Sequence, residues 1–228
     1  MMHAEVLTKI QAEVAEWEYL QSLPTAKGGF TLKKTLQEVE DRYEIFSYGD
    51  EEKHLELAAF YHEETNEYKV RLAYGLMKFV RTEFISRNLP DFTERITEHF
   101  DATLREMTEG SSVSPLLAQK ELNKWDYPLP ESAEGFALFC RPDKPFALAN
   151  DSYLIFEYAD FKANSGFDLF YNILRDEFFG ESRIRGLSVV TYDFDARDLA
   201  HLSEKLNLHL TKYLQDIRNQ TISVTVHS

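Results

Sequence analysis

The sequence predicts an α+β fold that is a tandem duplication of one unit, in which a helix, an antiparallel meander and a second helix follow one another. Residues 43–50 (YEIFSYGD) and 153–160 (YLIFEYAD) are identical at five of eight positions and lie 110 residues apart. The same offset aligns residues 79–107 with residues 189–217 without a gap. Self-similarity at a fixed period is typical of repeated structural units.

The segment between the two copies, TEGSSVS at residues 108–114, is short, small and polar, as linkers are. We therefore expect a first α+β repeat over residues 1–110 and a second over residues 111–228. Two copies in one chain imitate a homodimer, so we expect a monomer whose copies are related by a pseudo-twofold axis.

Each copy is expected to open with a helix. In the first copy, apolar residues recur at helical spacing over residues 6–17. In the second copy, Ser114 can cap the free amides of a helix that starts at Pro115, and Pro128 cannot continue it.

Strands are expected to follow the opening helices. Aromatic and β-branched residues favour strands at 43–48 and 153–158. Residues 54–61 and 68–76 flank the polar segment HEETNE, which predicts a hairpin.

In the second copy, residues 167–174 and 187–194 occupy the places of those two strands. The segment 167–178 could instead form a helix, because Phe170, Leu174 and Phe178 are spaced four residues apart. The sequence leaves this choice between strand and helix open.

A long helix is expected to close each copy, with Asn88 and Asp198 as its N-terminal caps. Apolar residues at helical spacing predict that each closing helix lies on its sheet. The two stripes consist of Phe92, Ile96, Phe100, Thr103 and Met107, and of Leu202, Leu206, Leu210, Tyr213 and Ile217.

The segment ISVTVH at residues 222–227 alternates apolar and polar residues, which predicts an extra C-terminal strand. An unpaired strand of this kind invites association with a sheet edge. We expect it to pair either within its own chain or with a second copy, and in the second case it would form a homodimer.

The chain carries a net charge of −14 and has no run of Lys or Arg. Nucleic acids and anionic membrane surfaces are therefore disfavoured as partners, whereas a basic protein partner is compatible with this charge. No apolar segment approaches the roughly 18 residues that span a bilayer, and the first residues lack a signal-peptide pattern. These two observations lead us to expect a cytoplasmic protein. Cys140 is the single cysteine, cannot form an intrachain disulfide, and is expected to be a small buried residue.

No catalytic, metal-binding or nucleotide-binding motif is present. The seven histidines show no ligand spacing beyond His54 and His62, which would face one another only by accident of the strand, so we expect no cofactor and no metal. Three residue pairs occupy equivalent positions in the two copies and are candidates for an interaction surface or pocket. The two tyrosines could lie in the core or line an open face. The two aspartates could start a turn or form a pair of carboxylates. The two histidines could be half-buried structural rings or titrating groups. These candidates are Tyr48 and Tyr158, Asp50 and Asp160, and His99 and His209.

The favoured function is a non-catalytic protein-binding module. At the level of fold alone, small acidic helix–meander–helix units resemble secretion chaperones and immunity-type proteins. One alternative is a small-ligand or sensor domain with an aromatic-lined pocket, and another is an enzyme with a dispersed site. If the chain is a binding module, we expect an exposed apolar patch or a free sheet edge. If it is a ligand domain, we expect a cavity. If it is an enzyme, we expect a cleft that contains titratable groups with shifted pKa values.

Overall fold

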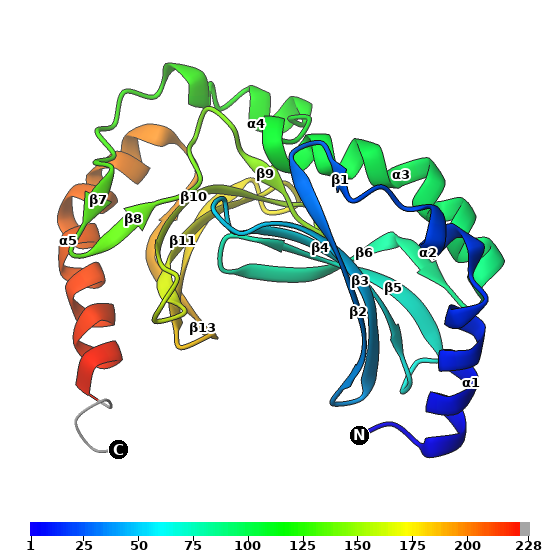
Figure 1. Cartoon of the computed structure of the whole chain (residues 1–228). Coiled ribbons are helices and arrows are strands. Elements are labelled where there is room, and N and C mark those ends of the chain that lie inside the picture. Colours follow the sequence, from blue (N-terminus) through cyan, green and yellow to red (C-terminus); the bar gives the residue numbers. More distant parts are fainter. Residues whose placement is uncertain (224–228) are drawn as a thin grey trace. The chain divides into compact units, whose positions relative to one another are not determined.

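The computed structural model describes residues 1–223 of the chain (Figure 1). The chain divides into two compact units, Met1–Thr108 and Glu109–Ser228. Helices accompany an antiparallel sheet in each unit, with six strands in the first sheet and seven in the second. The α+β class is therefore confirmed.

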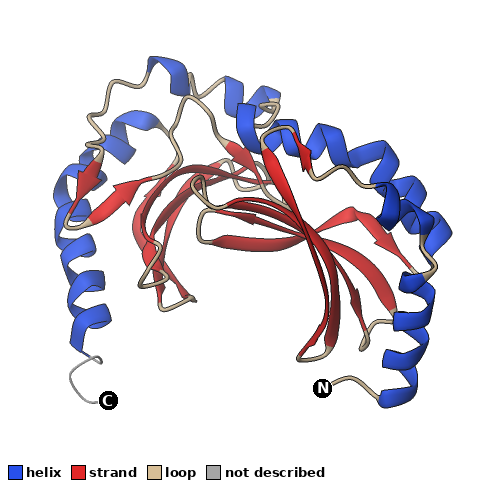
Figure 2. Ribbon diagram, in the orientation of Figure 1, coloured by secondary structure: helices blue, strands red, loops and turns tan. Residues whose placement is uncertain are grey.

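The first unit is a continuous meander with helices before and after it. The strands follow one another in the order β1-β2-β3-β4-β5-β6, and α1 and α3 lie on one face of the sheet (Figure 2). The elements are α1 (Ala4–Ala15), α2 (Glu18–Ser22), β1 (Ala26–Lys27), β2 (Phe30–Val39), β3 (Arg42–Asp50), β4 (Leu55–His62), β5 (Glu67–Tyr74), β6 (Met77–Ser86) and α3 (Leu89–Glu109).

The second unit has the same order of helices, strands and a closing helix, but its elements before β10 are shorter. Its sheet has the order β13-β12-β11-β10-β8-β7, with β9 paired to β10 beside β8. The elements are α4 (Pro115–Ala118), the 3₁₀ helix η1 (Leu122–Lys124), β7 (Ser132–Ala133), β8 (Phe136–Leu138), β9 (Phe146–Ala147), β10 (Ser152–Asp160), β11 (Ser165–Asn172), β12 (Glu177–Ile184), β13 (Leu187–Ala196) and α5 (Leu199–Ser223).

The open choice over residues 167–178 is resolved in favour of strands. β11 pairs with β12 from Gly166 to Asn172 and is buried along nearly its whole length, whereas Leu174 lies in the turn between these strands and is exposed. The Tyr171 hydroxyl donates to Asp176 Oδ1 over 2.6 Å and stabilises this turn. The sequence-based match of 187–194 to 68–76 was wrong, because β12 occupies the place of β5 and β13 that of β6.

The opening helices are shorter than expected. The first ends at Ala15, and Trp17 lies between α1 and α2 with an extended backbone. The second comprises one α-helical turn and a 3₁₀ turn before Trp125. The Ser114 hydroxyl accepts the Leu117 amide over 3.2 Å, which confirms the predicted cap.

The predicted C-terminal strand does not begin at Ile222, because Ile222 and Ser223 are the last two residues of α5. The Thr221 hydroxyl donates to the Ile217 carbonyl, and the Arg185 guanidinium donates to the Thr221 carbonyl, each over 2.8 Å. These bonds stabilise the final turn as a helix. The rest of the predicted strand, residues 224–227, lies outside the described residues.

The closing helices begin and pack as predicted. Asn88 Oδ1 accepts the Asp91 amide, and Asp198 Oδ1 accepts the His201 amide, each over 2.9 Å. The predicted stripes are buried, except that Tyr213 is partly exposed. Leu104 and Leu214 are also buried, so each stripe is wider than the sequence indicated.

The two cores use different combinations of large and small residues at one place. In the first unit Ala59 lies opposite Val70 across β4 and β5, and in the second Leu169 lies opposite Gly180 across β11 and β12. Because Gly180 has no side chain, the ring of Phe167 fits against this position of β12. The total side-chain volume at this place is therefore divided differently between the two neighbouring strands in the two units.

Candidate functional site

The candidate tyrosines lie in the two cores. Tyr48 and Tyr158 are fully buried, and their hydroxyls donate to the carbonyls of Pro24 and Pro130 over 2.6 and 2.8 Å. Burial raises the pKa of each phenol to about 12. Each side chain thus ties the segment after the opening helix to its sheet, and neither hydroxyl is available to a ligand.

The candidate aspartates close equivalent turns at the ends of β3 and β10. Asp50 accepts the backbone amide of Lys53 over 3.1 Å and its ammonium group over 2.7 Å, and the side-chain bond lowers the pKa of the carboxyl. Asp160 accepts the Ala163 amide over 3.1 Å and the Arg218 guanidinium over 2.6 Å. Burial acts to raise the pKa of Asp160, but these bonds outweigh it and the pKa is lowered.

The candidate histidines make equivalent edge-to-face contacts with a phenylalanine ring. His99 meets Phe84 at 5.9 Å between ring centroids, and His209 meets Phe194 at 6.2 Å. The interplanar angles of 88° and 86° are typical of edge-to-face packing. This geometry supports the structural interpretation of both rings.

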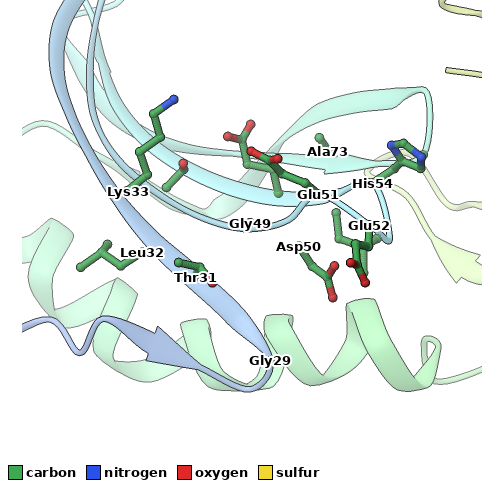
Figure 3. A pocket seen from close by; sticks show the side chains of 14 residues that line it. Gly29, Thr31, Leu32, Lys33, Gly49, Asp50, Glu51, Glu52, His54 and Ala73 are labelled. Carbon is green, nitrogen blue, oxygen red and sulfur yellow. The ribbon is translucent and has the colours of Figure 1, made fainter. Parts of the chain in front are cut away.

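A hollow of about 770 Å³ opens on the first unit, between β2, β3, β4 and β5 (Figure 3). Six of its fourteen lining residues have small side chains, which leave space above the sheet. Acidic residues gather at the β3–β4 turn beside it, so the hollow would favour a cationic ligand. The small residues are Gly29, Thr31, Ser47, Gly49, Ala73 and Gly75, and the acidic ones are Asp50, Glu51, Glu52 and Glu56.

Among the described residues, no Phe, Tyr or Trp lines that hollow, so it differs from the aromatic-lined pocket that the sequence suggested. A second hollow of about 420 Å³ does include Tyr61 and Tyr68. Their hydroxyls donate to Asn66 Oδ1 over 3.2 Å and to Glu13 Oε2 over 2.7 Å. Both hydroxyl protons are therefore engaged within the first unit.

The outer strand of the second sheet presents an uncharged apolar edge. In the described part of the chain, β13 pairs with β12 and ends the sheet. Its first six residues, LSVVTY, include no charged residue, and side chains on both faces are exposed. The exposed apolar residues are Leu187 (75%), Val189 (52%), Val190 (52%) and Tyr192 (77%).

The corresponding strand of the first unit, β6, carries charged residues. The β6 strand also ends its sheet, but it carries Lys78 and Arg81. Arg81 bonds Glu83 over 2.6 Å and Glu106 over 3.1 Å. Charged residues on an edge strand oppose the addition of another strand, and the LSVVTY segment lacks this protection.

A row of carboxylates crosses the second sheet on the face opposite α5. Glu157 lies opposite Asp168, and Asp168 lies opposite Glu181, on three adjacent strands. Glu157 and Asp168 are fully buried, and Arg183 Nη2 is 3.4 Å from Asp168 Oδ2. Among the described residues, Asp168 Oδ1 has no hydrogen-bond partner. Burial raises the pKa of Asp168 to about 6, against the opposing effect of Arg183.

Replacing Asp168 with asparagine is expected to stabilise the protein at neutral pH. The raised pKa means that Asp168 contributes stability below its ordinary pKa of 3.8, and that this contribution is lost as the pH rises through about 6. Urea denaturation should show the variant to be more stable at about pH 7.5 and equal to the wild type near pH 4. Asp126→Asn, at an exposed position, is the control. A stability difference that does not change with pH would contradict this assignment.

No protein-family model, curated protein or solved structure matches the chain. No helix among the described residues is both long enough and apolar enough to cross a membrane. Sequence reasoning predicted a strand at 187–194 but did not identify it as the strand that ends its sheet in the described part of the chain. The uncharged run LSVVTY, set against charged residues at the aligned positions of the first copy, was the available signal.

Proposed function

We propose that this chain is a non-catalytic protein-binding module that adds an extended segment of a basic protein partner to the edge of β13. The single observation that carries the proposal is the edge formed by LSVVTY, which has no charged residue and exposes apolar side chains on both faces of the strand. Strand addition satisfies the outward-facing backbone groups of an edge, while pockets between alternate side chains select the sequence that is bound.

The chemistry of the partner follows from the charges around this edge. Beyond LSVVTY the same strand continues with Asp193 and Asp195, and the chain carries a net charge of −14. An apolar extended segment followed by Lys or Arg would match both parts of the strand. The proposed compartment is the cytoplasm, where the buried thiol of Cys140 would stay reduced.

The proposal includes a tandem duplication, with the two copies related by a pseudo-twofold axis. Strands β10 to β13 each begin 110 residues after β3 to β6. Side-chain bonds recur at the same spacing, since Trp17 Nε1 donates to Thr93 Oγ1 and Trp125 Nε1 donates to Ser203 Oγ. After such a duplication, the second copy could evolve a β13 edge that binds a partner strand, while the charged residues of β6 in the first copy continue to oppose strand addition.

Fluorescence anisotropy with extended peptides is the direct test. The probes are ten-residue peptides of alternating Val and Thr that end in Lys-Arg or in Asp-Glu. We expect the basic peptide to bind more tightly, and Val190→Lys to weaken its binding at least about tenfold through charge repulsion and loss of apolar contact. Val190→Glu should weaken it less, because the added charge attracts the peptide. Leu208→Lys, at an apolar residue of α5 that is 73% exposed, is the matched control.

Two results would overturn this assignment. The first is equal binding of both peptides, or of neither, by the wild-type chain. The second is a homodimer, seen by light scattering, that Val190→Lys converts to a monomer, since the edge would then serve a second copy of the chain.

A further inference from the structure

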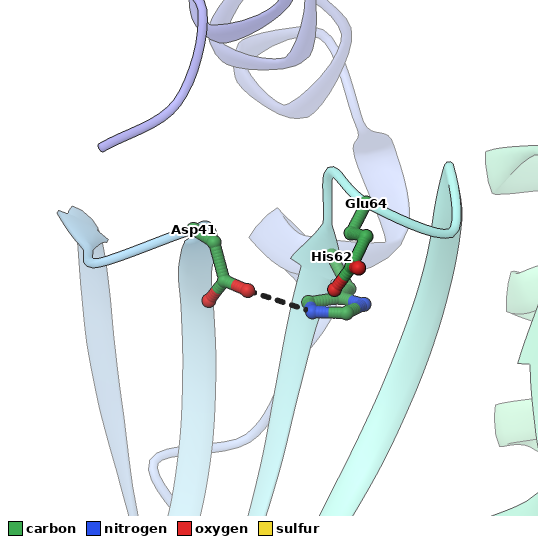
Figure 4. Close-up of side chains that lie close together, drawn as sticks. All are labelled: Asp41, His62 and Glu64. Atoms are coloured by element: carbon green, nitrogen blue, oxygen red, sulfur yellow. Dashed lines mark hydrogen bonds and ion pairs between the residues drawn. The ribbon is translucent and has the colours of Figure 1, made fainter.

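Three potential metal ligands meet at the tips of two neighbouring hairpins of the first unit (Figure 4). Asp41 lies in the turn between β2 and β3, His62 ends β4, and Glu64 follows in the next turn. One ligand atom from each residue lies within 4.8 Å of the other two. None of these residues belongs to the hollow or to the β13 edge.

Backbone contacts hold the two turns together. Arg42, the residue after Asp41, lies opposite His62 in the pairing of β3 with β4. The Glu63 amide donates to the Asp41 carbonyl over 3.1 Å, and the Asn66 amide donates to the Glu63 carbonyl over 3.0 Å. The three ligands therefore stand on a hydrogen-bonded frame, as a preorganised site requires.

The imidazole of His62 has suitable partners on both of its nitrogens. Nε2 lies 3.0 Å from Asp41 Oδ2, and Nδ1 lies 3.1 Å from Thr65 Oγ1. When Nδ1–H donates to the Thr65 hydroxyl, the lone pair of Nε2 faces the two carboxylates. This arrangement, in which the second ring nitrogen is bonded to a neighbour, is typical of histidines that bind metals.

The carboxylates suit a dication. Asp41 Oδ2 lies 3.0 Å from His62 Nε2, and one ligand atom of each of the three residues lies within 4.8 Å of the others, so a single cation could contact both carboxylates and the imidazole. Glu63 does not compete for the position, because it binds the His3 ring over 2.8 Å and the His3 amide over 3.0 Å. One imidazole with two carboxylates is a donor set for zinc, cobalt or nickel rather than for calcium.

We propose that Asp41, His62 and Glu64 form a surface site for a divalent transition metal such as Zn²⁺, with Thr65 orienting the imidazole. The metal replaces the hydrogen bond between Asp41 and His62 and links the two hairpin tips. Three protein ligands leave a coordination position for water or for a side chain of a bound partner.

The second unit supplies an internal comparison. The residues 110 positions further on are Asp151, Asn172, Leu174 and Arg175. The imidazole, the second carboxylate and the orienting hydroxyl are all replaced there. We therefore expect one metal per chain at this type of site.

Calorimetric titration of the full chain with Zn²⁺, and with Co²⁺ followed by visible absorption, tests the proposal. The wild type should bind one metal with micromolar affinity. His62→Asn, which installs the residue of the second unit, should abolish stoichiometric binding. Thr65→Ala should weaken binding by about 10–100-fold, the range for loss of a group that orients a ligand.

Glu52→Gln is the matched control, because it removes an exposed carboxylate from a different hairpin turn of the same unit. This variant should bind as the wild type does. Circular dichroism should show that the variants fold. Absence of stoichiometric binding by the folded wild type, unchanged affinity in His62→Asn, or equal weakening by Glu52→Gln would overturn the site. The last result would mean general attraction of cations to an acidic surface.

Discussion

Truncation of Phe100 to alanine is expected to destabilise the first unit by about 3–5 kcal/mol, the range for a buried phenylalanine. Phe100 is 3% exposed and connects α3 to the sheet. Its ring lies 5.2 Å from that of Tyr48 in an edge-to-face contact and 6.4 Å from that of Phe46. Alanine would leave a cavity between the helix and β3 that the hydrogen-bonded strand cannot close.

Chemical denaturation measures this effect as a change in the free energy of unfolding. The two compact units can unfold separately, so tryptophan fluorescence should be followed in a Trp125→Phe background, where Trp17 reports on the first unit alone. Glu98→Ala, at an exposed position of the same helix, should change stability by less than about 0.5 kcal/mol. A loss below about 1 kcal/mol for Phe100→Ala would mean that α3 is peripheral.

Replacing Gly180 with valine is expected to cost about 1–3 kcal/mol in the second unit, because it overpacks a filled core. A Cβ atom at Gly180 would lie 2.9 Å from Phe167 Cε2 and 2.9 Å from Phe194 Cδ2. These two rings already pack against each other at 4.6 Å between centroids. At these distances the strand or the two rings must shift.

The first unit indicates how to relieve this overpacking. Its residues at the equivalent positions are Leu57 and Val70, where the second unit has Phe167 and Gly180. Adding Phe167→Leu to Gly180→Val should therefore recover part of the lost stability, although Phe167→Leu alone destabilises. A double-mutant cycle from urea denaturation measures this coupling. Additive effects of the two substitutions would contradict the steric explanation.

Local patterns in the sequence were sufficient for the elements that local chemistry specifies. The closing helices were predicted from their caps, Asn88 and Asp198, and from apolar residues at helical spacing. The segments around Tyr48 and Tyr158 were predicted as strands because aromatic and β-branched residues dominate them. These signals each lie within one continuous segment of the chain and need no knowledge of neighbouring strands.

Elements with weak local signals were missed. In β2, only Phe30 is buried, so its apolar alternation is too sparse to indicate a strand. In β12, Gly180 replaces the apolar side chain that would continue the alternation, because Phe167 fills that space from the next strand. The period of β12 therefore becomes visible only once its neighbours are in place.

By itself the sequence determined the α+β class, the closing helices and the acidic character of this protein. Only the tertiary structure decided which residues meet. Asp41 and His62 are 21 positions apart in the sequence, yet their side chains lie 3.0 Å from each other. The row from Glu157 through Asp168 to Glu181 exists only in the register of three strands. The physical reason is that strand pairing joins residues far apart in the chain, and register is set by burial of a whole face rather than by any one of its residues.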